Sequence, residues 1–459
     1  MIAFRSKRFV YRLIFFTVLL LPVAATVAAD EEAAITVFLN VNVVTMSDEH
    51  IISGQTVIVE AGLIAQLGPV DSTPVPEASV IVDGTDRFLL PGLAEMHGHI
   101  PPASSPELGR VMTLLAANGV TTVRGMLGHP SHLDLRRDLL EGRVFGPRLV
   151  TSGLSLNGSS VSGAADGARQ VEAQHAAGYD FLKIHPGLDA GEFTAIAAAA
   201  RRLGMPFAGH VPAAVGLEMA LAEGIATIDH LDGYLAAMMP ANSDASGGYG
   251  GFFDVLLVDQ VQESKIASLV AQTITAGTWN VPTQALFVHR LSSVGTQELG
   301  RRPEMQYMPA ATVQQWANTR QQQENERGFS PALGDRAISL RRKLIRALHT
   351  AGAGLLLGSD APQVFNVPGF SLHDELQYLV DAGLSPFEAL STGTSAVARF
   401  LGSNTGVVAV GRDADLLLLD ANPLEDIANT RRIYGVMLRG RWYRAQDLHD
   451  RLQRYRASD

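Results

Sequence analysis

Short apolar segments alternate with longer alanine- and leucine-rich stretches between about residues 92 and 402. The short segments have the length of buried strands, and the longer stretches have the composition of helices. This alternation is typical of repeated βα units around a parallel sheet. Eight strands are predicted, at Leu89–Ala94, Thr121–Arg124, Arg148–Ser152, Phe181–Ile184, Pro206–Val211, Thr227–Leu231, Asn280–Phe287 and Leu355–Ser359. They predict an α/β fold with a (β/α)8, TIM-like barrel over residues 91–402, in which catalytic groups lie at the C-terminal strand ends.

Both ends of the chain have a different pattern, in which short strands follow one another without helical stretches. Turn residues such as Asp83-Gly84 and Gly440 separate these strands. We expect residues 30–90 and 403–446 to form one small β-sandwich domain, followed by a C-terminal tail at residues 447–459. Its strands are predicted at Ile35–Phe38, Thr56–Glu60, Ile64–Leu67, Val80–Val82, Ala414–Asp420 and Tyr434–Arg439.

Two spacers between the predicted barrel strands are longer than the others, at residues 232–262 and 288–335. Both follow strands on the face where a barrel keeps its catalytic groups, and both carry aromatic residues. We therefore interpret them as a lid and a pocket wall. The aromatic residues are Tyr234, Tyr249, Phe252, Phe253, Tyr307 and Trp316.

The first residues have the pattern of a secretory signal peptide. Basic residues precede an apolar run from Leu13 to Ala29 that contains no acidic residue, and the run ends in small residues. We assign residues 1–29 to the signal, with cleavage near Ala29, and expect a periplasmic or secreted protein without stable membrane insertion after signal removal. A retained anchor ranks second, because Pro22 interrupts the run and a spanning helix needs roughly 20 apolar residues.

Charge and cysteine content exclude several partners and chemistries. The formal net charge is -10, and loss of the four basic residues within 1–29 would change it to -14. A protein this acidic is not expected to bind nucleic acid. The absence of cysteine excludes disulfides, thiolate ligands and a cysteine nucleophile. Any metal must therefore be held by nitrogen and oxygen atoms.

The most specific local pattern is His97-Gly98-His99, which follows the first predicted barrel strand. In an extended chain, residues two apart face the same way, so both imidazoles point to one side. Two neutral imidazoles provide half of a metal site, and Gly98 leaves space beside them. In isolation such a pair is more often two unrelated loop histidines. Here further candidate ligands stand at the ends of later predicted strands, namely Lys183, His210, His230 and Asp360.

Together these positions resemble the amidohydrolase superfamily, in particular its metal-dependent dipeptidase and imidazolonepropionase-like branch. The resemblance covers nearly all of residues 34–445. It implies two divalent metal ions, the first held by His97, His99 and Asp360 and the second by His210 and His230. Zn2+ is the first expectation, although these donors also suit manganese, cobalt, nickel or iron. Beyond the histidine pair, the resemblance rests on Gly119–Arg124, Gly178–Ile184, Ala414–Leu416 and Asn422–Ile427.

In the binuclear members of that superfamily, a lysine after the fourth strand is carboxylated by carbon dioxide and bridges the two metals. The resemblance gives this role to Lys183. The residue pattern agrees, because Leu182 and Ile184 take the outward face and leave Lys183 inside the barrel, where an unmodified charge is costly. The alternative is a lysine that extends to solvent from a strand end.

The expected reaction is hydrolysis by water that the two metals activate. The ions would lower the pKa of a bridging water and polarise the substrate carbonyl. Asp360 would take the proton of this water as general base and later pass it to the leaving nitrogen as general acid. A serine nucleophile is disfavoured, since Ser152-Gly153-Leu154-Ser155 lacks the spacing of a nucleophile elbow.

Five further residues are candidates for contact with the substrate: His129, His185, Tyr234, Arg290 and His373. For each of the three histidines, a local hydrogen-bonding role is an equal alternative. Arg124 is a further candidate for a substrate carboxylate, and an ion pair inside the barrel is its alternative. The segments 125–128 and 157–160 depart from the family pattern, which leaves the substrate class open.

We therefore expect an enzyme that cleaves an amide (C–N) bond in a small molecule, such as a dipeptide or an N-acyl amino acid. Aromatic residues in the spacers favour a bulky, partly apolar substrate. The first alternative is hydrolysis of a cyclic amide, lactone or ester at the same site. The second is a non-catalytic periplasmic binding protein, which a complete ligand set disfavours. The sequence is compatible with a homo-oligomer.

Overall fold

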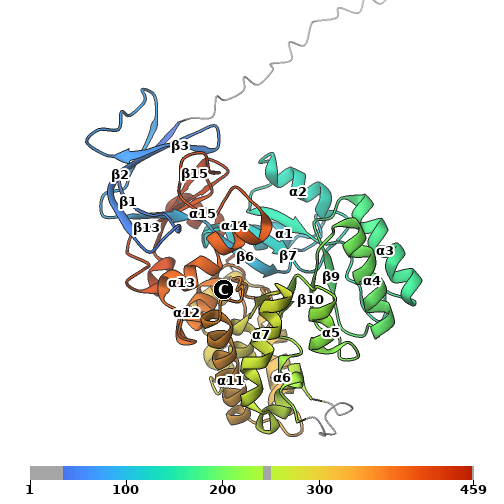
Figure 1. The fold of residues 1–459 in the computed structure, drawn as a ribbon. Coiled ribbons are helices and arrows are strands. Elements are labelled where there is room, and N and C mark those ends of the chain that lie inside the picture. The colour runs from blue at the N-terminus through green and yellow to red at the C-terminus, as the bar shows by residue number, and fades with distance from the viewer. Residues whose placement is uncertain (1–34, 241–249, 457–459) are drawn as a thin grey trace, which may run out of the picture.

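The computed structural model describes residues 35–240 and 250–456. Figure 1 shows two regions: a small sheet with the N-terminal strands in blue and the last strands in red, and a larger region of strands and helices. The predicted signal peptide at residues 1–29 lies outside the described residues. Among the described helices, none is long and apolar enough to cross a membrane.

The small sheet combines both ends of the chain, as the strand pattern predicted. Within the described residues it has eight strands in the order β15-β14-β13-β5-β1-β2-β3, and β4 pairs with β1 in parallel. The antiparallel pair of β13 and β5 joins the two chain ends, with Leu418 opposite Leu89. The two-layer form of a sandwich stays a prediction. The strands are β1 (Thr36–Val44), β2 (Ile51–Glu60), β3 (Leu63–Pro69), β4 (Val80–Asp83), β5 (Phe88–Pro91), β13 (Leu416–Leu419), β14 (Ile433–Leu438) and β15 (Arg441–Arg444).

Parallel strands in the larger region form two sheets, ordered β6-β7-β8 and β9-β10-β11-β12. A parallel bridge between Ser152 and Phe181 connects the sheets on one side, and isolated bridges at Leu355 and Ala361 connect their other edges. The eighth predicted strand therefore forms isolated bridges rather than a regular strand. These contacts follow the strand order that eight βα units predict. The strands are β6 (Leu93–Gly98), β7 (Val120–Gly125), β8 (Arg148–Thr151), β9 (Leu182–Ile184), β10 (Phe207–Gly209), β11 (Thr227–Asp229) and β12 (Trp279–Val281).

The first predicted barrel strand, residues 89–94, is divided in the structure. The N–H of Gly92 donates to the carbonyl oxygen of Asp415 in the small-sheet region, whereas the N–H of Leu93 donates to that of Gly119, next to β7. The chain thus leaves one sheet and enters the other within a continuous apolar run. The predicted bounds were wrong because this run carries no mark of the change of partner.

The seventh predicted strand, residues 280–287, is also shorter than expected. It ends at Val281, because Pro282 has no N–H to donate and Thr283 has a φ of 50° in the left-handed region. Helix α8 (Gln284–Leu291) begins directly afterwards. Arg290, predicted just beyond a strand, therefore lies on a helix.

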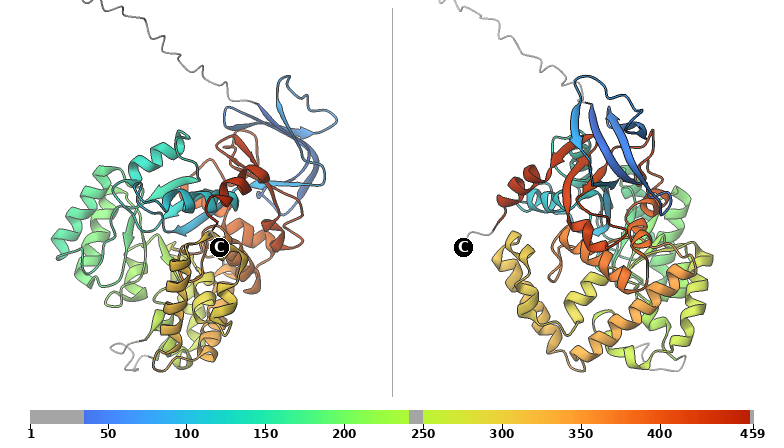
Figure 2. Two further views of the ribbon diagram at one scale, coloured as in Figure 1. Left: turned by 180° about the vertical axis from the view of Figure 1, so that it is seen from behind. Right: turned by 90° about the vertical axis from the view of Figure 1, so that its left-hand side faces the viewer.

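Helices separate the parallel strands and lie around them, with α3 and α4 on one side and α7 and α11 on another (Figures 1 and 2). The predicted C-terminal tail begins inside helix α15. The other helices are α1 (Leu108–Ala117), α2 (His132–Leu140), α3 (Ala164–Ala177), α4 (Ala190–Leu203), α5 (Gly216–Ala222), α6 (Tyr234–Ala237), α7 (Ile266–Ala276), α9 (Thr296–Gly300), α10 (Ala310–Glu324), α11 (Pro331–Thr350), α12 (Phe370–Asp381), α13 (Pro386–Thr392), α14 (Ser395–Leu401) and α15 (Ala445–Gln453), with short 3-10 turns η2 (Phe252–Gln260), η3 (Glu263–Lys265), η4 (Pro303–Tyr307) and η5 (Ile427–Arg431).

Alternation along the parallel strands separates apolar from polar side chains. On β9, Leu182 and Ile184 belong to the main apolar cluster, whereas Lys183 between them is buried and lies outside that cluster. On β11, Thr227 and Asp229 share a buried face with each other. The face of these strands that carries Lys183 and Asp229 is thus buried and charged, and charged groups there need partners.

Candidate metal centre

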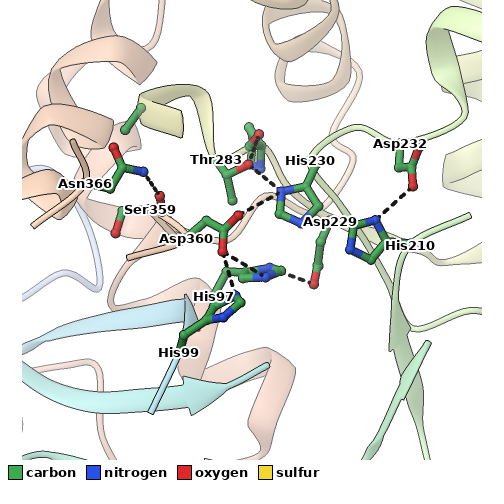
Figure 3. Close-up of polar contacts among 12 residues, drawn as sticks. His97, His99, His210, Asp229, His230, Asp232, Thr283, Ser359, Asp360 and Asn366 are labelled. Carbon is green, nitrogen blue, oxygen red and sulfur yellow. Dashed lines mark hydrogen bonds and ion pairs between the residues drawn. The ribbon is translucent and has the colours of Figure 1, made fainter. Parts of the chain in front are cut away.

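Three of the predicted ligands converge at the C-terminal ends of the parallel strands. His97 lies at the end of β6, His230 follows β11, and Asp360 belongs to the bridging segment before Ala361. All three are buried, and one ligand atom of each lies within 4.8 Å of the others (Figure 3). Imidazole nitrogens and carboxylate oxygens are donors that zinc and similar divalent ions take.

His99 joins this group through Asp360. Its Nε2 lies 2.8 Å from Oδ1 of Asp360, and Nε2 of His97 lies 3.5 Å from the same oxygen. Oδ1 is buried, and the described residues give it no aligned hydrogen bond. The two histidines of the His-x-His pair therefore face one carboxylate, as their spacing predicted.

The backbone at two members of the group is in the left-handed region. φ is 64° at His230 and 62° at Asp360, a conformation that costs a residue with a side chain about 1–2 kcal/mol. At His230 this turn directs the imidazole toward Asp360 although the preceding residue, Asp229, already faces His97. Strained residues of this kind cluster at functional sites.

Lys183 and His210 bring the rest of the predicted ligand set to the same region. Nζ of Lys183 is buried without a hydrogen bond among the described residues, and Oδ2 of Asp229 lies 3.8 Å from it. Burial lowers the pKa of Lys183 to about 8. The ring centroid of His210 lies 4.8 Å from that of His230, and its Nδ1 lies 3.1 Å from Oδ2 of Asp232.

The buried histidines are neutral and can offer lone pairs. Burial lowers the pKa values of His97 and His230 well below their usual range. The Thr283 hydroxyl lies 2.7 Å from the carbonyl oxygen of Pro282 and donates to it, so it accepts at 2.8 Å from Nδ1–H of His230. The lone pair of His230 is then on Nε2.

These observations fit a metal site built from nitrogen and oxygen donors. Nζ of Lys183 and Oδ1 of Asp360 are polar and buried, and neither has a hydrogen bond among the described residues. Buried polar atoms normally have partners, so each such exception calls for one. Carboxylation would give the Lys183 side chain an anionic end, which suits a metal site better than an ammonium group does.

One of the residues predicted to contact the substrate lies beside the ligand histidines. The ring centroid of His185 is 5.0 Å from that of His210, and burial lowers the pKa of His185 to about 3. His129 has its Nδ1 2.8 Å from a hydroxyl two residues later in its own loop. Arg290 is linked to the pocket by Phe252. Its guanidinium lies 3.8 Å above the ring of Phe252, and Phe252 lines the pocket beside His210.

Tyr234 and His373 are not brought into the site. The hydroxyl of Tyr234 is buried 2.7 Å from Oγ1 of Thr273. His373 is buried between Oγ1 of Thr430, 2.9 Å from its Nδ1, and the carbonyl oxygen of Asn118, 3.1 Å from its Nε2. For His373 the geometry agrees with the alternative of local hydrogen bonding.

The spacer at residues 232–262 reaches the ligand histidines. The ring of Phe253 lies over those of His210 and His230, with centroid distances of 5.8 and 5.1 Å. Phe253 also lines a pocket that opens beside His210. The interpretation of this spacer as a pocket wall is therefore supported by its aromatic contacts.

In the spacer at residues 288–335, the aromatic residues have a different location. Tyr307 and Trp316 belong to a buried apolar cluster together with Phe365. They pack the spacer against the rest of the protein instead of lining the pocket. The sequence pattern could not separate these uses, because an aromatic residue in a long spacer fits either.

The sequence of this protein is similar to a known family. The sequence matches the profile of the amidohydrolase family over residues 88–443, which is most of the 459-residue chain. The chain belongs to the amidohydrolase family. None of the curated proteins matches this amidohydrolase.

Several solved structures share the fold of this amidohydrolase. A Xaa-Pro dipeptidase with bound methionine in its active site is 18% identical, with 90% of this chain and 100% of that chain covered and a TM-score of 0.64. The bottromycin amidohydrolase is 24% identical, with 91% and 90% covered and a TM-score of 0.68. The A. niger ochratoxinase is 17% identical, with 90% and 96% covered and a TM-score of 0.63.

Sequence reasoning missed two carboxylates that contact the candidate ligands of this amidohydrolase from within the strands. Oε1 of Glu95 accepts the N–H groups of His97 and Ser359, both at 2.9 Å, and so ties the two ligand-bearing segments together. Strand alternation could have indicated Glu95, because it shares a face with His97. Asp229 could have been found in the same way, because it shares a face with Thr227.

The sequence pattern gave no indication of two other residues that contact the candidate ligand histidines. Asp232 and Thr283 meet ring nitrogens of His210 and His230, respectively. Both lie beyond the ends of regular strands, where backbone turns rather than strand alternation set the direction of a side chain. Thr283 itself has a φ of 50°.

Proposed function

We propose that this amidohydrolase is a metal-dependent enzyme that cleaves the amide bond of dipeptides or N-acyl amino acids with an apolar group. The observation that carries the proposal is the buried convergence of His97, His230 and Asp360. The dipeptidase and amidohydrolase among the structures of similar fold support the same reaction type. The aromatic ring of Phe253 beside the site favours an apolar substituent near the reacting bond.

The proposed ligands divide into two sets and one bridge. His97, His99 and Asp360 would hold one divalent ion, His210 and His230 the other, and carboxylated Lys183 would bridge them, with zinc as the first choice. When bound, such ions lower the pKa of water and polarise a carbonyl group.

The residues of the chain then have separate tasks. Asp360 accepts the proton of the attacking water and returns it to the leaving nitrogen, so that the amine departs neutral. Thr283 and Asp232 meet Nδ1 of His230 and Nδ1 of His210, respectively, so that Nε2 of each ring would be the metal ligand. Phe253 covers both imidazoles, which limits the access of bulk water.

The proposal includes features of the whole chain. We infer that the bridges at Ser152, Leu355 and Ala361 complete a closed (β/α)8 barrel over residues 91–402, with the small β domain at residues 30–90 and 403–446. Export by the signal at residues 1–29 would place the enzyme in the periplasm or outside the cell. A homo-oligomer is compatible with this arrangement.

An activity screen with a matched variant tests the proposal. The parent, loaded with Zn2+ or Mn2+, is assayed against dipeptides, N-acyl amino acids, cyclic amides, lactones and esters, beside Asp360→Asn and the surface control Asp259→Asn. We expect turnover of linear amides by the parent and control, and turnover by Asp360→Asn lower by at least about 100-fold. Parent-like turnover by Asp360→Asn would refute its role. If the parent cleaves only lactones or cyclic amides, the substrate class is a cyclic compound instead of a linear amide. If the parent binds these compounds and cleaves none of them, the protein is a binding protein.

A further inference from the structure

The carboxylate of Asp229 is fixed from one side by the interior of the barrel. Its Oδ1 accepts from the Thr227 hydroxyl at 2.8 Å and from Nη2 of Arg124 at 3.2 Å. Arg124 is held in turn, because its Nε donates to the carbonyl oxygen of Met96 at 2.7 Å. The orientation of the carboxylate is therefore set by strands β6, β7 and β11 together.

The other oxygen of Asp229 faces two of the proposed ligand residues. Oδ2 lies 3.0 Å from Nδ1 of His97 and 3.8 Å from Nζ of Lys183 (Figure 3 shows the contact with His97). All three atoms are buried, and none has an aligned hydrogen bond among the described residues. Two lone pairs at 3.0 Å repel, so this approach is favourable only when Nδ1 of His97 carries a proton.

We propose that Asp229 is a positioning residue that keeps the ring proton of His97 on Nδ1 and leaves the lone pair of Nε2 directed toward Asp360. The inference deepens the proposed function, on which its consequence for metal binding rests. A carboxylate partner on the second ring nitrogen fixes the tautomer of a ligating histidine and raises its basicity. The tautomer itself is a property of the metal-free protein.

If Asp229 were only the counter-ion of Arg124, the position of just one of its two carboxylate oxygens would be explained. That role explains why Oδ1 meets the guanidinium, but not why Oδ2 lies between His97 and Lys183. Nζ of Lys183 lies 3.8 Å from Oδ2, which is beyond hydrogen-bond distance, so the direct contact of Oδ2 is the one with His97.

The variant Asp229→Asn separates the two roles. The amide oxygen must replace Oδ1, because Thr227 and Arg124 both donate there. The NH2 group then replaces Oδ2 and points at Nδ1 of His97, which must offer a lone pair and pass its proton to Nε2. The matched control Thr227→Val removes a donor to Oδ1 and leaves the Oδ2 side unchanged.

The tautomer is measured by long-range 1H–15N NMR on metal-free full-length protein labelled with 15N-histidine, with His97 assigned by loss of its signals in His97→Gln. We expect Nδ1–H in the parent and in Thr227→Val, and Nε2–H in Asp229→Asn. Nε2–H in the parent, or Nδ1–H retained in Asp229→Asn, would overturn the proposal. If Asp229→Asn does not fold, the parent spectrum still decides, and the double variant Arg124→Met/Asp229→Asn removes the unpaired guanidinium.

Chelator competition with Zn2+ gives the second readout. We expect Asp229→Asn to bind Zn2+ about 10–100-fold more weakly than the parent, and Thr227→Val to bind within about threefold. Equal affinity of Asp229→Asn and parent would overturn the link to metal binding. If the parent neither binds metal nor cleaves amides, the proposed function fails, while the tautomer in the metal-free protein still confirms or refutes the role of Asp229.

Discussion

Replacing Lys183 by methionine is expected to stabilise the metal-free protein while it removes the bridge of the proposed metal centre. The amine is buried without a hydrogen bond, and its closest carboxylate oxygen given by the described residues lies 3.8 Å away. Methionine fills a similar volume with apolar atoms. A side chain that lowers stability is retained at functional sites when the function needs it.

The magnitude follows from the pKa of the amine. Burial lowers the pKa of Lys183 from 10.5 to about 8, and each pKa unit corresponds to about 1.4 kcal/mol. At pH 7 the ammonium form therefore costs about 3 kcal/mol relative to the unfolded chain. Between pH 8 and 10.5 the unfolded chain binds more protons than the folded protein, so the stability of the parent rises with pH across this window and its deficit relative to Lys183→Met shrinks.

Urea denaturation at pH 7 and pH 10, on protein depleted of metal and carbon dioxide, measures both effects. Lys183→Met should have the higher midpoint at pH 7 and a smaller advantage at pH 10. Lys343→Met is the control, because Nζ of Lys343 is an exposed partner of Glu263 and its loss should change stability by no more than about 0.5 kcal/mol. A lower midpoint for Lys183→Met than for the parent at pH 7 would refute the reasoning.

Three further changes test the surroundings of the site. Burial lowers the pKa of His373 to about 3, so this residue should contribute a loss of up to about 1.4 kcal/mol of stability for each pH unit below 6.5, and the slope of His373→Gln in urea titrations should be smaller than that of the parent by this amount. Glu375 accepts the N–H groups of Gln284 and Ala285 at 2.9 and 2.6 Å, so Glu375→Ala should lower the free energy of unfolding by about 1–3 kcal/mol for each donor left unpaired. Phe253→Ala should raise KM for amides with aromatic groups by about 10-fold and change KM for glycine amides less, as measured by steady-state kinetics.

Each of these expectations has a result that contradicts it. An unchanged pH slope in His373→Gln would mean that folding does not lower the pKa of His373. Equal stability of Glu375→Ala and Glu375→Gln would show that the backbone donors find other acceptors. Equal KM changes for aromatic and glycine amides would remove Phe253 from the pocket wall.

The fold was predictable wherever one pattern covered a whole element. Alternation of apolar segments with helical stretches indicated the parallel strands, and alternation within β9 indicated that Lys183 lies on the inner face. The bounds failed where the pattern does not mark a change of partner, as at Gly92 between the two sheets. They also failed where Pro282 and a left-handed Thr283 ended a strand inside an apolar run.

The candidate site was also predictable only in part. His97, His99 and Lys183 were predictable because strand alternation sets their direction. His230 and Asp360 reach the cluster through left-handed backbone turns. Their positions at strand ends made them candidates, but these positions do not determine where their side chains point. Hydrogen bonds that orient the candidate ligands, such as the one from His230 to Thr283, depend on contacts between the ends of neighbouring strands. One sequence contains no direct sign of them.

The central claim is that the protein has a binuclear metal centre. Its most direct test is the metal content per chain of protein purified with bicarbonate, measured by inductively coupled plasma mass spectrometry. The variants are Lys183→Ala and the surface control Lys343→Ala. We predict about two divalent ions per chain in the parent and the control and a marked loss in Lys183→Ala. One ion per chain that persists in Lys183→Ala, or no ion in the parent, would contradict it.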